Sequence, residues 1–174
     1  AWVHFQSKNF AQSLEVFSTP SLGSSNLSDY VHFYKGLNLK KLGELEKAEV
    51  EFKSADQRDS NMRLKNESIF NLGEISLERK NFRQAQQYFS KGERRARGTE
   101  SYPDIIFNLA RAERGLRNYP RMCHWLKRLY SKFPSYAKIK DWGYDLASNQ
   151  FENHPTNCKF DMDDFRSRVR YYLW

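Results

Sequence analysis

Long hydrophobic runs are missing from this sequence, because apolar residues follow one another only a few at a time. A membrane-spanning helix needs about 20 consecutive, mainly apolar residues, so the sequence predicts no span. Two cysteines are too few for a disulfide scaffold or for a four-thiolate zinc site. Eight glycines and five prolines exclude collagen-like and low-complexity structure. No signal peptide is visible, although a mature exported chain has lost its own.

Signatures of catalysis are also missing. The four histidines form no metal-ligand spacing with a cysteine or with one another, and no glycine-rich phosphate loop is present. Cys123 and His124 are adjacent on a predicted helix, so they point to different faces. The sequence therefore predicts no active site, no metal site and no cofactor. A disulfide between Cys123 and Cys158 stays an open alternative, conditional on an exported parent protein.

Positive charge is concentrated in one part of the chain. The net charge is +8, and residues 91–140 carry 13 basic and 4 acidic residues, whereas residues 1–90 carry 12 and 11. Such asymmetry can indicate an anionic partner, but a solvated helix surface is the favoured interpretation. No base-reading motif accompanies the cluster, so nucleic acid is the less favoured partner.

An internal repeat of 37 residues is the main positive feature of the sequence. Each copy has a small residue early, a second small or medium residue twelve positions later, and a large apolar residue four positions after that. The three series are Gly36, Gly73 and Ala110; Ala48, Ala85 and Met122; and Phe52, Phe89 and Leu126. A shorter copy at the N-terminus ends in the same way, with Phe17 in the place of Phe52.

Each copy predicts a pair of amphipathic helices, because its apolar residues recur with helical spacing. A short polar turn separates the two helices of each pair. These turns are Lys8-Asn9, Gly43-Glu44, Lys80-Asn81 and Arg117-Asn118. The small residues at the recurring positions are expected to let the second helix cross the first closely, where a larger side chain would hold the backbones apart.

The spacing of Gly73, Phe82, Ala85, Phe89 and Gly92 resembles the tetratricopeptide repeat (TPR) family, and Pro134 stands where that family places its closing proline. The resemblance covers residues 1–134, with the first repeat truncated. It implies an all-α fold, a right-handed superhelix (α-solenoid) of about three to four TPR-like helix pairs. Residues 135–174 are expected to form C-terminal capping helices that continue in a longer parent protein. The Ser-, Gly- and Pro-rich stretch 19–28 is the expected flexible insertion.

In TPR proteins the first helix of each pair lines a concave face that binds peptides. Carried over to this sequence, the resemblance implies an aromatic groove lined by Tyr30, Phe33, Tyr34, Phe70, Asn71, Phe107, Asn108, Arg111 and Arg114, with Trp2 and Phe5 at its N-terminal end. Aromatic rings would supply contact area, the asparagines would bind peptide amides, and the arginines would bind a carboxylate. The alternative is that several of these aromatic residues pack against neighbouring repeats or against a helix that this sequence does not include.

The sequence thus predicts a non-catalytic protein- or peptide-binding scaffold. A weaker resemblance, of layout only, is to the superhelical arm that precedes the catalytic domain of soluble lytic transglycosylases, which cut peptidoglycan in the bacterial periplasm. Glu67-Ser68 and Glu100-Ser101 lack the downstream Gly-Leu-Met-Gln stretch of that family, so no catalytic domain is expected here. A third hypothesis is polyanion or nucleic-acid binding by residues 91–140. The compartment stays open between periplasm, slightly favoured, and cytoplasm.

Overall fold

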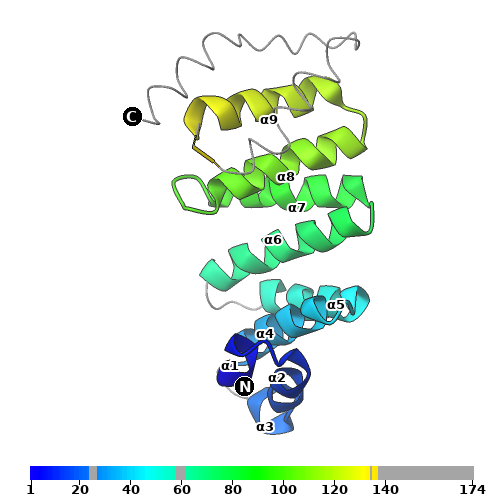
Figure 1. Ribbon diagram of the computed structural model, residues 1–174, viewed down its shortest axis with the longest axis vertical. Coiled ribbons are helices and arrows are strands. Elements are labelled where there is room, and N and C mark those ends of the chain that lie inside the picture. The colour runs from blue at the N-terminus through cyan, green and yellow to red at the C-terminus, as the bar shows by residue number, and fades with distance from the viewer. Residues whose placement is uncertain (24–26, 58–61, 134, 137–174) are drawn as a thin grey trace. The chain divides into compact units, whose positions relative to one another are not determined.

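The computed structural model describes residues 1–23, 27–57, 62–133 and 135–136, and the regular structure in these ranges is all helical. The chain divides into two compact units, Ala1–Arg95 and Ala96–Trp174. The first unit contains α1 (Trp2–Gln6), α2 (Phe10–Phe17), α3 (Pro20–Gly23), α4 (Ser28–Lys41), α5 (Leu45–Gln57), α6 (Met62–Glu78) and α7 (Phe82–Arg95), and the second contains α8 (Tyr102–Gly115) and α9 (Tyr119–Lys132) (Figure 1). None of these described helices is long and apolar enough to cross a membrane.

Helices that follow one another in the sequence pack together in space. In the first unit α4 packs on α5, α5 on α6 and α6 on α7, and in the second unit α8 packs on α9. The all-α prediction and the prediction of sequential helix pairs are therefore confirmed. The expected insertion at residues 19–28 is partly helical, because Pro20–Gly23 forms a helical turn and α4 begins at Ser28. The capping helices expected after Tyr136, and Cys158 with them, lie outside the described residues.

The turn inside each helix pair has the same backbone conformation. The φ angle is +60° at Lys8, +81° at Gly43, +58° at Lys80 and +56° at Arg117. After each of these residues, the next amide donates to the carbonyl five residues back, as Asn81 N does to Ser76 O at 2.8 Å. This is the Schellman closure of a helix C-terminus, which requires a left-handed residue. The four predicted turns are thus confirmed, and three of them place a non-glycine residue in the left-handed region.

Replacing Lys80 with glycine is expected to raise the free energy of unfolding by about 0.5–1 kcal/mol. A left-handed L-residue carries a steric penalty of about 1–2 kcal/mol, and the extra freedom of glycine in the unfolded chain offsets part of the gain. The matched change is Gly43→Ala, which should lower stability by a similar amount. No atom lies within 4 Å of the Cβ position at Gly43, so only backbone strain is added there. Urea unfolding followed by circular dichroism measures both variants, and a less stable Lys80→Gly would contradict the turn geometry.

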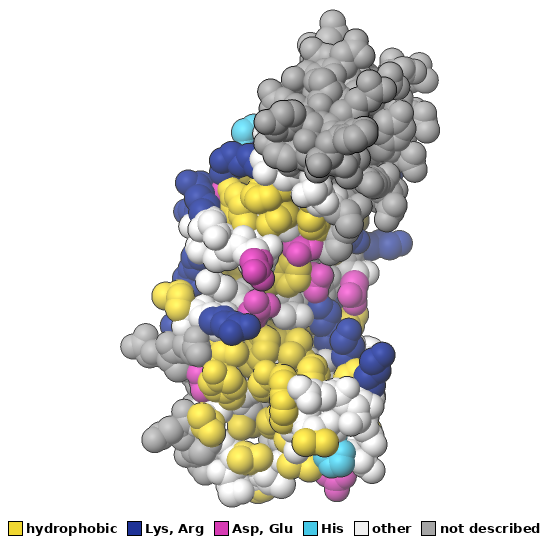
Figure 2. All heavy atoms as spheres, turned by 60° about the vertical axis from the view of Figure 1, so that its left-hand side comes forward, with side chains coloured by type: hydrophobic (Ala, Val, Ile, Leu, Met, Phe, Trp, Pro, Cys, Tyr) yellow, Lys and Arg dark blue, Asp and Glu magenta, His cyan; other side chains and the backbone are white. Residues whose placement is uncertain are grey.

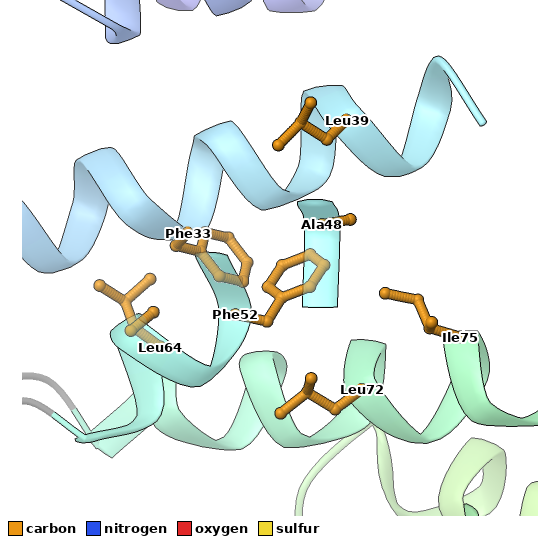
Figure 3. Packing of buried hydrophobic residues seen from close by; sticks show 8 residues of the cluster. Phe33, Leu39, Ala48, Phe52, Leu64, Leu72 and Ile75 are labelled. Atoms are coloured by element: carbon orange, nitrogen blue, oxygen red, sulfur yellow. The ribbon is translucent and has the colours of Figure 1, made fainter. Parts of the chain in front are cut away.

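The core of the first unit lies where α4, α5 and α6 meet. Phe52 of α5 is fully buried, and Phe33 of α4 packs edge-on against it with ring centroids 5.9 Å apart. Figure 3 shows these two rings between Leu39 above and Leu72 below, with side chains from all three helices pointing inward. Full burial of an apolar side chain of this size contributes about 1.5–3 kcal/mol. The core therefore holds α4 and α5 together and also packs α6, which belongs to the next pair, against them.

Glycines mark the points where two helices of a pair approach most closely. A Cβ atom on Gly36 would lie 2.8 Å from the Phe52 ring, and one on Gly73 would lie 2.6 Å from the Phe89 ring. Both distances are shorter than real Cβ contacts, so the predicted role of these two glycines is confirmed. The α8–α9 pair has Ala110 and Leu126 at the equivalent places, and both are fully buried. In this pair the first helix has alanine in place of glycine, and the second helix has the smaller leucine in place of phenylalanine.

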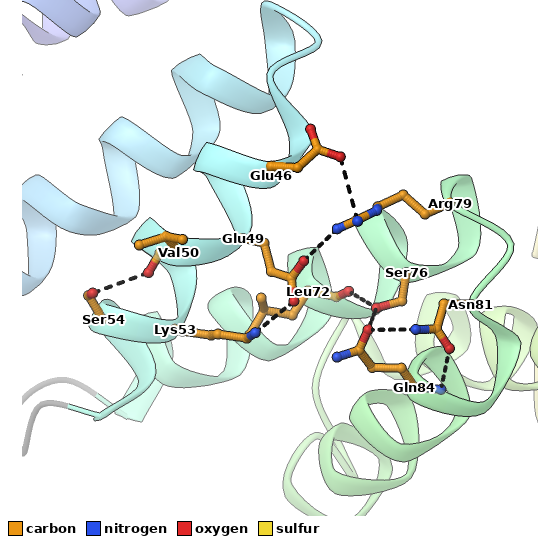
Figure 4. Close-up of polar contacts among 10 residues, drawn as sticks. All are labelled: Glu46, Glu49, Val50, Lys53, Ser54, Leu72, Ser76, Arg79, Asn81 and Gln84. Atoms are coloured by element: carbon orange, nitrogen blue, oxygen red, sulfur yellow. Dashed lines mark hydrogen bonds and ion pairs between the residues drawn. The ribbon is translucent and has the colours of Figure 1, made fainter.

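Ion pairs connect α5 and α6 outside the core. Arg79, the residue directly after α6, donates to Glu49 of α5 at 2.8 Å and lies 3.5 Å from Glu46 (Figure 4). Lys53 also pairs with Glu49, at 2.7 Å, and this hydrogen bond is the main cause of the raised pKa of Lys53. Exposed pairs of this kind contribute about 0–1 kcal/mol each. The Arg79 pairs therefore assist the register of α5 and α6, while the apolar core supplies most of the stability.

Candidate functional site

Aromatic rings gather where α1, α2 and α4 meet in the first unit. Tyr34 of α4 lies at the centre, with its ring centroid 5.1 Å from Trp2, 5.6 Å from Phe5 and 5.5 Å from Phe17. Tyr30, one helical turn earlier, stacks on Tyr34 at 6.4 Å. Such offset and edge-on pairs are the favoured arrangements of aromatic rings. The cluster attaches the two short N-terminal helices to the longer α4.

A hollow of about 380 Å³ opens beside this cluster, lined by Trp2, Phe17, Leu27, Tyr30 and Tyr34. We refer to it as the aromatic hollow. Its wall contains no charged side chain, and Trp2 is 48% exposed, Leu27 58% and Tyr30 39%. Figure 2 shows hydrophobic side chains gathered over the lower part of the face, the region of the N-terminal helices. Small-molecule and peptide pockets typically have volumes of about 300–1,000 Å³, so the hollow is large enough to hold a ligand group.

Burial is the main influence on the ionisation of Tyr34, the central residue of the hollow. Burial raises the pKa of the Tyr34 phenol, and the neighbouring Tyr30 raises it further, whereas the charge of Arg63 lowers it. Arg63 is an exposed residue in the first turn of α6, and that turn contains no acidic residue.

The structure brings four of the sequence-predicted groove residues together at the aromatic cluster. Tyr30 and Tyr34 lie beside Trp2 and Phe5, as the carried-over groove positions imply. Phe33 differs, because its side chain is 7% exposed and belongs to the core between α4 and α5. Adjacent residues on a helix point about 100° apart, so the face that presents Tyr30 and Tyr34 directs Phe33 inward.

The α6 residues of the predicted groove are engaged within the chain. Phe70 is half-buried and packs edge-on against Phe89, at 5.9 Å. Asn71 is buried, and its Oδ1 accepts a hydrogen bond from Lys40 Nζ at 2.9 Å. The other amide atom, Nδ2, donates to the Glu67 carbonyl at 2.8 Å. In this structure the Asn71 amide connects α4 to α6, so a peptide amide would have to compete with these two bonds.

The second unit covers its own predicted groove residues. Tyr136 packs edge-on against Phe107 at 6.0 Å, and its hydroxyl donates to Asp104 at 2.5 Å. Phe107 is 7% exposed as a result. The side chain of Asn108 is 2% exposed and accepts a hydrogen bond from Arg111 at 3.0 Å. Phe107 and Asn108 are thus interior side chains rather than an open surface, because the segment after α9 returns onto α8.

The two arginines of the predicted groove remain at the surface of the second unit. Arg111 is exposed, and Arg114 is half-buried. Other basic side chains of the cationic stretch also make contacts inside the chain: Lys91 pairs with Asp56 at 2.7 Å, and the Arg128 guanidinium lies 5.6 Å from the centre of the Tyr102 ring. Part of the basic stretch between residues 91 and 140 is therefore used for packing and pairing.

Two residues of the aromatic hollow, Phe17 and Leu27, were not predicted as site residues. Phe17 occupies the repeat position of the core residue Phe52, which favoured a buried side chain. Leu27 lies in the stretch expected to be a flexible insertion. Leu27 occupies the N-cap position of α4, and no sequence motif singled it out.

Metal binding has no support among the residues that the structure describes, since no group of three or more potential ligands lies together there. Compared with known proteins, the sequence matches no family model, and no curated protein is significantly similar to it. The resemblance to TPR proteins therefore depends on the repeat spacing and on the helix pairs described above.

Proposed function

We propose that this chain is a non-catalytic scaffold that binds a protein or peptide, and that the aromatic hollow is its binding site. The observation that carries the proposal is a hollow of about 380 Å³ with an apolar wall and half-exposed rings at its edge. Tryptophan and tyrosine are the residue types that most often dominate binding energy at protein interfaces. An apolar patch that stays open on a soluble protein commonly marks an interaction site.

The same proposal includes a TPR-like architecture for the helix pairs. Its support is the 37-residue period, the shared left-handed turn within each pair, and the matched glycine and phenylalanine positions. Repeats of this type expose an extended surface along their first helices, and Tyr30 and Tyr34 belong to such a helix. No described feature favours the lytic-transglycosylase arm or the polyanion hypothesis over this one, and both stay predictions of the sequence.

Alanine at Trp2 or Tyr30 is expected to weaken peptide binding at least ten-fold. The test selects binders from a displayed peptide library on the full chain and then measures the Kd of one synthetic peptide by fluorescence anisotropy. Truncation of an aromatic hot spot costs about 2 kcal/mol or more, which corresponds to a factor above ten. Val50→Ala is the matched control, because Val50 is a 63% exposed apolar residue of α5 that does not line the hollow.

A peptide that binds all three variants with the parent affinity would locate the binding site elsewhere. A library that yields no binder at millimolar concentration would remove the support for a peptide-binding scaffold. Circular dichroism spectra of Trp2→Ala and Tyr30→Ala should match the parent spectrum, because both side chains are at least one-third exposed.

A further inference from the structure

We propose that the surface of α6 carries a second binding site, formed by Glu67 and Phe70, which accepts a tyrosine side chain from a partner peptide. The tyrosine ring would pack on Phe70, and its hydroxyl would donate to the Glu67 carboxylate. None of the residues that line the aromatic hollow belongs to α6. The proposal therefore goes beyond the proposed function and does not depend on the hollow.

The second unit shows how a tyrosine occupies a site of this kind. The ring of Tyr136 packs edge-on against Phe107, and its hydroxyl donates to the carboxylate of Asp104. Asp104 and Phe107 are three residues apart on α8, so their side chains lie on the same face of the helix. One tyrosine thus satisfies both members of the pair, the phenylalanine through its ring and the acid through its hydroxyl.

The same pair of residues recurs on α6. Glu67 and Phe70 stand 37 residues before Asp104 and Phe107, one repeat period earlier, with the same spacing on the first helix of their pair. Glu67 and Phe70 are both half-buried, whereas Phe107 is only 7% exposed beneath Tyr136. The α6 pair therefore offers the same two contacts and keeps part of its surface open.

The Glu67 carboxylate is available as a hydrogen-bond acceptor. Within the part of the chain that the structure describes, its oxygens make no hydrogen bond or ion pair, and only the backbone carbonyl of Glu67 accepts a bond, from Asn71. Lys40, the basic side chain that reaches α6 from α4, binds Asn71 and Glu74 instead. A donor from a partner would therefore not have to displace an existing contact of this carboxylate.

The chain does not supply its own tyrosine to the α6 pair. Tyr136 lies four residues after the end of α9, and Thr99 takes the same position after α7. The Thr99 side chain has no ring, and its hydroxyl donates to the Ala96 carbonyl at 2.7 Å. At the two equivalent positions of α4 stand Tyr30 and Phe33, which offer no carboxylate. The acid–phenylalanine pair of α6 is thus matched to a tyrosine that another molecule would provide.

The test uses the uncharged peptide acetyl-Pro-Ser-Tyr-Ala-amide, which copies residues 134–137 of this chain. A second peptide has phenylalanine in place of the tyrosine and differs from the first only by the hydroxyl. Binding to the full chain is followed through the amide resonances of Glu67 and Phe70. We expect the tyrosine peptide to shift both resonances and to bind about ten-fold more tightly than the phenylalanine peptide, because a hydrogen bond to a charged acceptor is stronger than one between neutral groups.

Substitution of Glu67 provides the matched comparison. Glu67→Ala should remove the advantage of the tyrosine peptide over the phenylalanine peptide, and Glu67→Gln, which keeps a neutral acceptor at the same place, should reduce it. Glu78→Ala and Glu78→Gln make the same changes at the exposed last residue of α6 and should keep the ten-fold difference. Glu67→Gln keeps the experiment decisive if Glu67→Ala fails to fold.

The possible outcomes separate this site from the aromatic hollow. Equal affinities of the two peptides for the parent protein, or no shift of Glu67 and Phe70 at millimolar peptide, would overturn the α6 site and leave the hollow untouched. Shifts confined to Trp2 and Tyr30 would also overturn it, because the peptide would then occupy the hollow and support the proposed function. Shifts confined to Asp104 and Phe107 would show that the peptide only exchanges with Tyr136 on α8, which equally contradicts a site on α6.

Discussion

Gly73→Leu should lower the free energy of unfolding by about 3 kcal/mol or more, at or beyond the upper end of overpacking penalties. Even the first added carbon would lie 2.6 Å from the ring of Phe89, which is fully buried. The ring has no free space to move into, so α6 and α7 would have to separate. Urea unfolding measures the loss. Gln87→Leu, an exposed position on α7, is the control for added apolar volume and should change stability by less than about 0.5 kcal/mol.

A double-mutant cycle tests the same contact with smaller changes. Gly73→Ala with Phe89→Leu recreates in the α6–α7 pair the Ala110 and Leu126 combination of the α8–α9 pair. Alanine gains about 1 kcal/mol of helix propensity over glycine, so Gly73→Ala should stabilise the protein once Phe89 is leucine and destabilise it while the phenylalanine is present. The coupling energy should fall within about 0.5–3 kcal/mol. Simple additivity of the two changes would show that residues 73 and 89 do not touch.

The helix pairs were predictable because they depend on local and periodic features. A small residue at Gly73 and a large one at Phe89 form one contact within a single repeat, and the same contact recurs at Gly36 and Phe52. The turns are equally local, since a left-handed residue closes a helix wherever the next amide reaches back five residues. Sequence spacing alone specifies both features, without knowledge of how one pair meets the next.

The candidate site was only partly predictable, because exposure depends on which segment covers a face. The sequence places Tyr34 and Phe107 on first helices of their pairs, and nothing in the local pattern separates them. Tyr136 returns from a distant part of the second unit to cover Phe107, whereas the rings around Tyr34 leave a hollow between them. Asn71 shows the same dependence, since its partner Lys40 comes from the preceding helix pair.

Tyr34→Ala is expected to release α1 and α2 from the rest of the first unit. The substitution removes the ring that Trp2, Phe5 and Phe17 all contact, and loss of a packed aromatic side chain costs about 3–5 kcal/mol, with the lower value suited to a half-buried ring. Leu14 of α2 also packs against the core, but Ser13 is the one fully buried residue of the two short helices. Hydrogen exchange should therefore become fast for residues 2–17 while α5 and α6 stay protected.

Tyr34→Phe is the matched control, because it keeps the ring and removes only the hydroxyl. Exchange in α1 and α2 should stay slow, and the aromatic hollow should still bind its peptide.

Tyr34→Phe and the parent protein should differ in stability at alkaline pH. Burial raises the pKa of Tyr34 in the folded state above the value of about 10 in the unfolded chain, so its contribution to stability is complete below pH 10 and is lost as the pH rises further. Because Tyr34→Phe has no phenol to ionise, it should lose less stability than the parent protein as the pH rises above 10. Slow exchange of residues 2–17 in Tyr34→Ala would show that contacts other than this ring hold α1 and α2. The Tyr34 ring would then not be the contact that keeps the walls of the aromatic hollow together.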